Sequence, residues 1–193
     1  MVTGSHNPKD HNGFKMMLSD RPFFGDDILG LAKLLEANDL VEGQGTCEEK
    51  SVQDDYVERM LEDCILAESD SQLLDEIDTF KPKKKLKIAW DAGNGAAGEV
   101  MVQLSKRIAA DHILLYPEID ATFPNHHPDP TVPENLQDLI KVVLDEGCDL
   151  GIAFDGDGDR IGVVDNEGAI IWGDQLMVFY AREILQKKQG ATI

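Results

Sequence analysis

The sequence predicts an α/β fold made of two mixed α/β layers, a truncated first domain followed by a complete second domain. In residues 86–108 an apolar stretch leads through a glycine-rich turn into an amphipathic stretch, which is the pattern of a strand, a loop and a helix. This alternation continues through the following residues, whereas the basic run 81–85 is typical of a solvated linker. We therefore place a domain boundary near residue 81 and divide the chain into residues 1–81, 82–173 and 174–193.

The first region carries fewer elements, and its helices are the clearest of them. Apolar residues recur at helical spacing in residues 26–37, and a second helix opens near Ser51. The polar turn that begins the chain has no preceding element to hold it, so we expect further sequence upstream. The remaining predicted elements are a short strand at 14–18, a loop at 40–47 and a short helix at 73–77.

In the second region, strands and helices follow one another in order. Pro133 suits a helix start, and Gly147 suits the end of that helix. Trp90 and Trp172 fall on predicted strands, and we expect both in the core rather than as sugar-stacking platforms. The predicted elements are strands at 86–90, 113–116 and 150–154, helices at 97–108, 133–146 and 174–186, and a hairpin of 161–164 with 169–172.

Composition limits the classes of partner. The formal net charge is -19, from 37 acidic and 18 basic residues, which argues against nucleic acid and anionic membranes as partners. No signal segment or long apolar run is present in the sequence, so we expect a cytoplasmic protein. Cys47, Cys64 and Cys148 are odd in number and are expected to be packing residues. The sequence does not indicate an oligomeric state.

The most informative motif is Asp155-Gly156-Asp157-Gly158-Asp159-Arg160, directly after an apolar strand. Glycines let the backbone turn alternate carboxylates toward one point, where they repel one another unless a hard cation lies between them. Oxygen ligands favour Mg²⁺ or Ca²⁺ over zinc. An EF-hand is excluded because Arg160 replaces the loop glycine and Asn166 replaces the bidentate glutamate. A solvated acidic turn is the alternative.

Two further motifs are weaker. Ser5 lies in the polar loop 3–8, and Lys15 could help to neutralise a phosphate there, although adjacent Ser5 and His6 do not suit a hydrolase relay. His126, His127 and Asp129 could form a zinc site, but adjacent histidines seldom chelate one ion. The prolines around these three residues favour a rigid turn instead.

Taken together, these motifs resemble the α-D-phosphohexomutase family. Residues 3–8 are similar to its active-site serine loop, and residues 155–160 are similar to its metal loop. The resemblance extends to residues 12–15, 91–95 and 123–130, of which the last points to the phosphomannomutase/phosphoglucomutase branch. Neither the family's sugar-recognition loop nor its C-terminal phosphate-binding domain is found in these residues.

The resemblance implies a role for each matching residue. Ser5 would be the phosphoserine, and Asp155, Asp157 and Asp159 would hold Mg²⁺ together with a phosphoserine oxygen. The phosphoryl group would be supported by three further residues, namely His6, Lys15 and Arg160.

The implied reaction interconverts hexose 1-phosphate and hexose 6-phosphate, of mannose or glucose, through a hexose 1,6-bisphosphate. We expect this chain alone to be inactive as a mutase. The alternative is a non-catalytic α/β module that binds Mg²⁺ or Ca²⁺.

Overall fold

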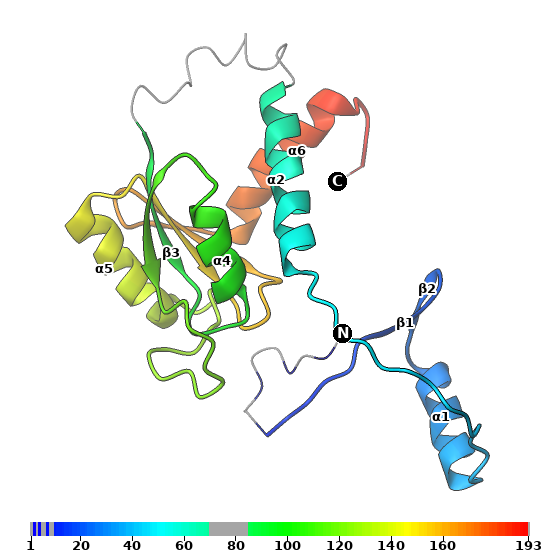
Figure 1. The fold of residues 1–193 in the computed structure, drawn as a ribbon. Helices are drawn as coiled ribbons and strands as arrows, with labels where there is room; N and C mark the ends of the chain where they lie inside the picture. The colour runs from blue at the N-terminus through cyan, green and yellow to red at the C-terminus, as the bar shows by residue number, and fades with distance from the viewer. Residues whose placement is uncertain (1, 3, 5–6, 8–9, 70–84, 193) are drawn as a thin grey trace.

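The computed structural model describes residues 2, 4, 7, 10–69 and 85–192, and Figure 1 shows their path. The predicted helix at 73–77 lies outside the described residues, as does most of the basic run 81–85. The described elements form an α/β fold, as the sequence predicts.

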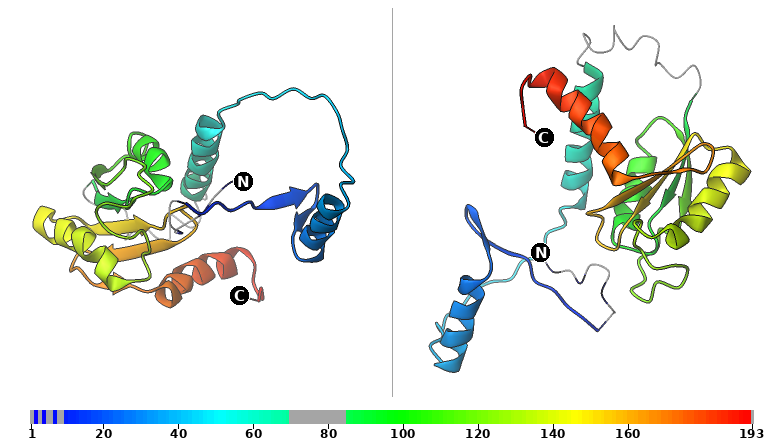
Figure 2. Two further views of the ribbon diagram at one scale, coloured as in Figure 1. Left: turned by 90° about the horizontal axis from the view of Figure 1, so that it is seen from below. Right: turned by 180° about the vertical axis from the view of Figure 1, so that it is seen from behind.

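The first part of the chain contains a small hairpin and two helices. Strands β1 (Met16–Leu18) and β2 (Arg21–Phe23) pair antiparallel, and α1 (Asp26–Glu36) follows them. Helix α2 (Gln53–Ser69) comes after an extended connection. In all three views the hairpin and α1 project away from the sheet, whereas α2 lies beside it (Figures 1 and 2).

The second part is built on one five-stranded sheet of order β4-β3-β5-β6-β7. Strand β3 pairs in parallel with β4 and β5, and β6 and β7 extend the sheet antiparallel. The strands are β3 (Lys87–Asp91), β4 (Asp111–Leu115), β5 (Leu150–Phe154), β6 (Ile161–Asp165) and β7 (Ile170–Ile171). The two parallel crossovers place the carboxyl ends of β3, β4 and β5 at the same edge.

Helices cover both faces of this sheet. Helix α5 (Gln137–Glu146), preceded by the 3₁₀ turn η1 (Pro133–Leu136), packs on one face over Ala89, and α4 (Ala97–Ser105) covers the other face. This division follows from the side-chain alternation of a strand, because Ile88 and Trp90 point opposite to Ala89. Outside α4, α2 adds Val57 and Leu61 against Leu104 of α4.

Two sequence-based predictions about packing are wrong. Trp172 is 45% exposed and precedes α6 (Gly173–Lys187), where its backbone N–H donates to the Gln175 side chain at 2.9 Å. It therefore begins a helix instead of filling the core, whereas Trp90 is buried as predicted. Cys148 is buried, but Cys47 is exposed in an irregular segment and packs against no core.

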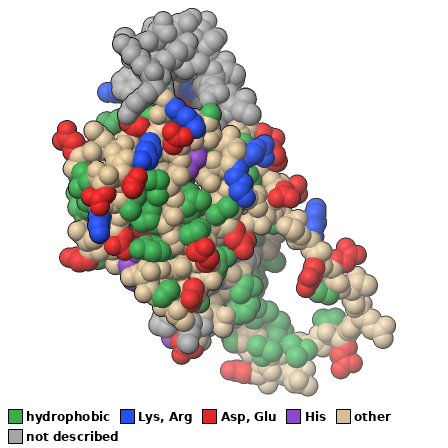
Figure 3. Space-filling model, turned by 60° about the vertical axis from the view of Figure 1, so that its left-hand side comes forward, with side chains coloured by type: hydrophobic (Ala, Val, Ile, Leu, Met, Phe, Trp, Pro, Cys, Tyr) green, Lys and Arg blue, Asp and Glu red, His purple; other side chains and the backbone are tan. Residues whose placement is uncertain are grey.

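Among the described residues, no helix has both the length and the apolar character that crossing a membrane requires. Figure 3 shows one face of the surface, on which acidic side chains are more widespread than basic ones and hydrophobic side chains lie between them.

Candidate functional site

The acidic motif forms a tight turn at the carboxyl end of β5. The Gly158 N–H donates to the carbonyl oxygen of Asp155 at 3.2 Å, and the Arg160 N–H donates to Oδ1 of Asp155 at 3.0 Å. Gly158 has a φ of 76°, a left-handed conformation that glycine adopts without the steric cost of a Cβ. The turn brings a carboxylate oxygen from each of Asp155, Asp157 and Asp159 within 4.8 Å of one another.

The three carboxylates differ in their exposure to solvent. Asp155 is fully buried, the side chain of Asp157 is 5% exposed, and that of Asp159 is 59% exposed. Burial is the largest cause that raises the pKa of Asp155, and the neighbouring charges of Asp157 and Asp159 add to it. Oδ2 of Asp155 is buried and accepts no hydrogen bond from the described residues.

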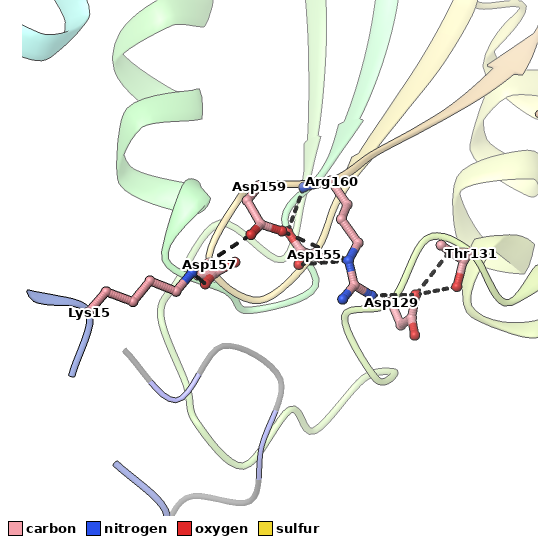
Figure 4. A network of polar contacts seen from close by, with 7 residues as sticks. All are labelled: Lys15, Asp129, Thr131, Asp155, Asp157, Asp159 and Arg160. Carbon is pink, nitrogen blue, oxygen red and sulfur yellow. Dashed lines mark hydrogen bonds and ion pairs between the residues drawn. The ribbon is translucent and has the colours of Figure 1, made fainter. Parts of the chain in front are cut away.

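Two basic side chains approach this cluster from opposite sides (Figure 4). The Lys15 Nζ lies 3.7 Å from Oδ2 of Asp157 and 3.9 Å from Oδ2 of Asp159. The Arg160 Nε lies 3.9 Å from Oδ2 of Asp155 and 3.9 Å from Oδ1 of Asp159. Lys15 comes from the segment just before β1, so the first part of the chain reaches the turn at the end of β5.

The chemistry of this donor set fits a hard divalent cation. Its oxygens are all carboxylate oxygens, which suit Mg²⁺ and Ca²⁺ better than zinc. The carboxylate of Asp155 is held without solvent beside two like charges, an arrangement that a bound cation would relieve. Asp155, Asp157 and Asp159 are therefore the candidate metal ligands.

The structure tests only part of the predicted serine loop. Ser5 and His6 lie outside the described residues, so their roles stay predictions. Val2 forms an isolated antiparallel bridge with Phe14, next to Lys15. The bridge sets Val2 beside Phe14, the chain neighbour of the lysine that contacts the acidic turn.

Asp129, which the sequence suggests only as a possible zinc ligand, lies instead against Arg160 of the acidic turn. Its Oδ1 lies 3.8 Å from Nη1 of Arg160 and accepts hydrogen bonds from the backbone N–H and the hydroxyl of Thr131, at 3.1 and 2.6 Å (Figure 4). His126, in contrast, points its Nε2 at Asp91, 2.9 Å away. Asp129 and His126 thus have different partners, which supports the rigid-turn interpretation over a zinc site.

The comparisons with known proteins agree with the motifs. Residues 54–168 match the family model described as "Phosphoglucomutase/phosphomannomutase, alpha/beta/alpha domain II". Over the whole chain, the sequence is 44% identical to a phosphomannomutase/phosphoglucomutase of Pseudomonas putida and 42% identical to one of Pseudomonas aeruginosa. It is 38% identical to a phosphoglucomutase of Neisseria meningitidis. The chain spans 38% of the length of the two Pseudomonas proteins.

Solved structures give the same result. A phosphoglucomutase/phosphomannomutase family protein of Burkholderia thailandensis superposes with a TM-score of 0.82 at 43% identity, covering 98% of this chain and 38% of its own. A putative phosphomannomutase of Thermus thermophilus shares the fold, with a TM-score of 0.68 at 24% identity, 97% of this chain and 41% of its own. Because the family model matches more than half of the residues and the fold agrees, this chain belongs to the phosphoglucomutase/phosphomannomutase family.

Proposed function

We propose that this chain supplies the phosphoserine and the metal-binding turn of a phosphohexomutase that interconverts hexose 1-phosphates and hexose 6-phosphates. The observation that carries the proposal is the cluster of three carboxylates at the end of β5, with a lysine and an arginine against it. The names of its relatives support the substrate class, which is mannose phosphate, glucose phosphate or both.

In this proposal the phosphoryl group moves between Ser5 and the sugar. The bond from Ser5 Oγ to phosphorus breaks while a sugar hydroxyl oxygen bonds to phosphorus, which gives a hexose 1,6-bisphosphate. The proton that the sugar hydroxyl loses ends on the departing Ser5 Oγ. The reverse transfer, from the other end of the bisphosphate, restores the phosphoserine and releases the isomeric monophosphate. Most of the acceleration in such transfers comes from positioning and from stabilisation of charge.

Each described residue of the site has a definite task in this scheme. Asp155, Asp157 and Asp159 would hold Mg²⁺, which when bound neutralises charge on the transferring group. Lys15 and Arg160 place positive charge beside the turn, where a phosphate would enter, and Asp129 orients the Arg160 guanidinium. His6 is proposed as a further support for the phosphoryl group.

The domain boundaries and the location in the cell stay proposals. We assign residues 1–81 to domain I, 82–173 to domain II and 174–193 to the start of domain III, while the family model for domain II begins at residue 54, within α2. A cytoplasmic location is likewise proposed from the sequence.

A second candidate is an α/β module that binds Mg²⁺ or Ca²⁺ without catalysis. The oxygen-only donor set favours it as much as it favours a mutase, because these ligands suit either cation. Only the mutase requires a phosphorylated Ser5.

Titration with MgCl₂ in a calorimeter tests the metal site. The wild-type chain should bind Mg²⁺, and the triple variant Asp155→Asn, Asp157→Asn, Asp159→Asn should lose at least about tenfold in affinity, equal to about 1.4 kcal/mol. A matched control neutralises three exposed aspartates elsewhere, namely Asp20→Asn, Asp39→Asn and Asp145→Asn. Equal affinity for the triple variant and the wild type would rule out the site.

A further inference from the structure

A buried ion pair lies beside the metal-binding turn and takes no part in the function proposed above. Asp91, at the end of β3, is fully buried, and the side chain of its partner His126 is 13% exposed. Oδ1 of Asp91 accepts a hydrogen bond from the Gly93 N–H at 2.8 Å, and Oδ2 lies 2.9 Å from Nε2 of His126. Both carboxylate oxygens are therefore engaged.

The partners of the His126 ring determine its protonation. Nδ1 lies 3.0 Å from the carbonyl oxygen of His127, which can only accept, and Nε2 faces a carboxylate. Both ring nitrogens therefore face oxygen atoms that can accept, which favours the imidazolium form of His126. The hydrogen bond with Asp91 is the largest cause that raises the pKa of His126, against the opposing effect of burial.

The surroundings of the ring favour the same charge state. The Tyr116 ring meets the His126 ring edge-on at 5.5 Å, and its hydroxyl donates to Asp138 of α5 at 2.7 Å. The negative charge of Asp138 also raises the pKa of His126. The titratable groups around this ring are thus Asp91, Tyr116, His127 and Asp138.

His126 also packs directly against the turn that follows β3. Gly93 in this turn has a φ of 51°, and a Cβ added there would lie 3.0 Å from Cε1 of His126. The next residue, Asn94, bonds to the same segment as His126: its amide donates to the Glu118 carbonyl at 2.9 Å, and its Oδ1 accepts from Asn125 at 2.8 Å. The segment 116–126 therefore fixes one side of the turn 93–96.

The other side of this turn touches the metal-binding turn. The Ala96 N–H donates to the carbonyl oxygen of Gly156 at 2.9 Å. A Cβ added to Gly95 would lie 2.9 Å from that oxygen and 3.1 Å from the Cα of Gly156, so the two turns are in close backbone contact. Gly156 stands between Asp155 and Asp157, and a movement of the turn 93–96 would change the separation of these two carboxylates.

We propose that His126 is a positioning residue for the metal site. Its contacts hold the turn 93–96 in place between Asp91 and Gly156. The position of this turn then fixes the spacing of the Asp155 and Asp157 carboxylates. The inference rests on the proposed function in taking Mg²⁺ as the ligand of this turn. His126 would act by alignment, because contacts behind the ligands orient the carboxylates that bind the ion.

The first test compares Mg²⁺ affinity between two neighbouring histidine variants. His126→Gln should weaken Mg²⁺ binding about tenfold in a calorimetric titration, while His127→Gln, a change at an exposed histidine, should leave it unchanged. Asp91→Asn should resemble His126→Gln, and the double variant should lose no more affinity than either single variant. Unchanged affinity in both single variants would overturn the proposal.

The second test needs no substitution, so it remains decisive if a variant fails to fold. The pKa of His126 is followed by NMR through its Cε1–H signal, without MgCl₂ and at saturating MgCl₂. If the imidazolium favours the binding-competent turn, linkage requires Mg²⁺ to raise this pKa, by up to about 1 for a tenfold coupling. A cation acting only through its charge would lower it.

The outcomes distinguish a failure of the positioning role from a failure of the proposed function. A raised His126 pKa with an unchanged His127 pKa supports the positioning role. An unchanged or lowered His126 pKa in a chain that binds Mg²⁺ overturns the role and leaves the proposed function standing. A wild-type chain that binds no Mg²⁺ overturns both.

Discussion

Asp155 is the carboxylate in the acidic turn with the least access to solvent. It is fully buried and its Oδ2 accepts no hydrogen bond from the described residues, while its Oδ1 accepts from the Arg160 N–H. Burial raises its pKa, which means that the ionised form is destabilised when no cation is bound. The residue that we propose as a metal ligand is therefore also a source of instability in the metal-free chain.

Asp155→Asn should stabilise the metal-free chain and weaken Mg²⁺ binding. The amide keeps an oxygen for the Arg160 N–H and removes a buried charge, so we expect a gain of about 1 kcal/mol in the free energy of unfolding. Urea unfolding in EDTA measures the gain. The control Asp159→Asn removes the same charge from a side chain that is 59% exposed and should gain less than half as much. A less stable Asp155→Asn chain would contradict the account.

Single residues could be predicted from the sequence where the signal is local. The three aspartates were found because glycines alternate with them in one short stretch, and the structure brings their oxygens together. Asp129 with Arg160, and Asp91 with His126, were not found as pairs. The two members of each pair are 31 and 35 residues apart in the chain, and they meet because parallel strands end at one edge of the sheet.

Helix α4 depends on a very close approach to the segment after β4. A Cβ added at Gly98 would overlap the carbonyl oxygen of Pro117, which is backbone and cannot turn away. The absence of a side chain at this position allows α4 to cover Trp90 and Met101 to be fully buried. The place of α4 on the sheet thus follows from one glycine in its first turn.

Gly98→Ala should destabilise the sheet domain by about 3 kcal/mol, because α4 must shift away from the core to relieve the overlap. The matched control is Gly30→Ala, also within a helix, where nothing lies within 4 Å of an added Cβ. Alanine there should leave the chain as stable or raise its stability by up to about 1 kcal/mol. Urea unfolding followed by tryptophan fluorescence measures both. Equal stabilities of Gly98→Ala and the wild type would contradict this packing.

The spacing of apolar residues in the sequence predicts most of the described helices and strands. The predicted ends differ from the observed ends by a few residues. The predicted helix 97–108 ends earlier, at Ser105, because the chain turns there to lead into β4. The sequence predicts Trp172 on the strand 169–172, where an aromatic residue usually packs inward. It lies instead at the point where β7 gives way to α6, which the local pattern did not reveal.

Across the whole molecule, large apolar side chains remain exposed on two helices. Leu29 and Leu35 of α1 are about 60% exposed, as are Val178 and Phe179 of α6. The described residues of both helices bury no side chain fully.

The chain spans only 38% of the length of its Pseudomonas relatives. Very low mutase turnover by this chain alone therefore stays a prediction.

If this chain carries the phosphoryl donor of a mutase, it must accept one phosphoryl group on Ser5, whether or not it completes a full turnover. In the proposed scheme the phosphate bound to Ser5 comes from the sugar bisphosphate. The turn proposed to hold Mg²⁺ lies beside Lys15, which follows Phe14 of the Val2–Phe14 bridge. A module that only binds metal has no need of this transfer. Phosphorylation of Ser5 therefore separates the two candidate functions.

The most direct measurement is phosphopeptide mapping after a long incubation of the chain with glucose 1,6-bisphosphate and MgCl₂. The account predicts a mass increase of about 80 daltons on the peptide that contains Ser5, as expected for one phosphate. It also predicts that this increase disappears in Ser5→Ala and falls strongly in the Asp155, Asp157 and Asp159 triple variant. Phosphate found only on other residues, or labelling that persists in Ser5→Ala, would contradict the account.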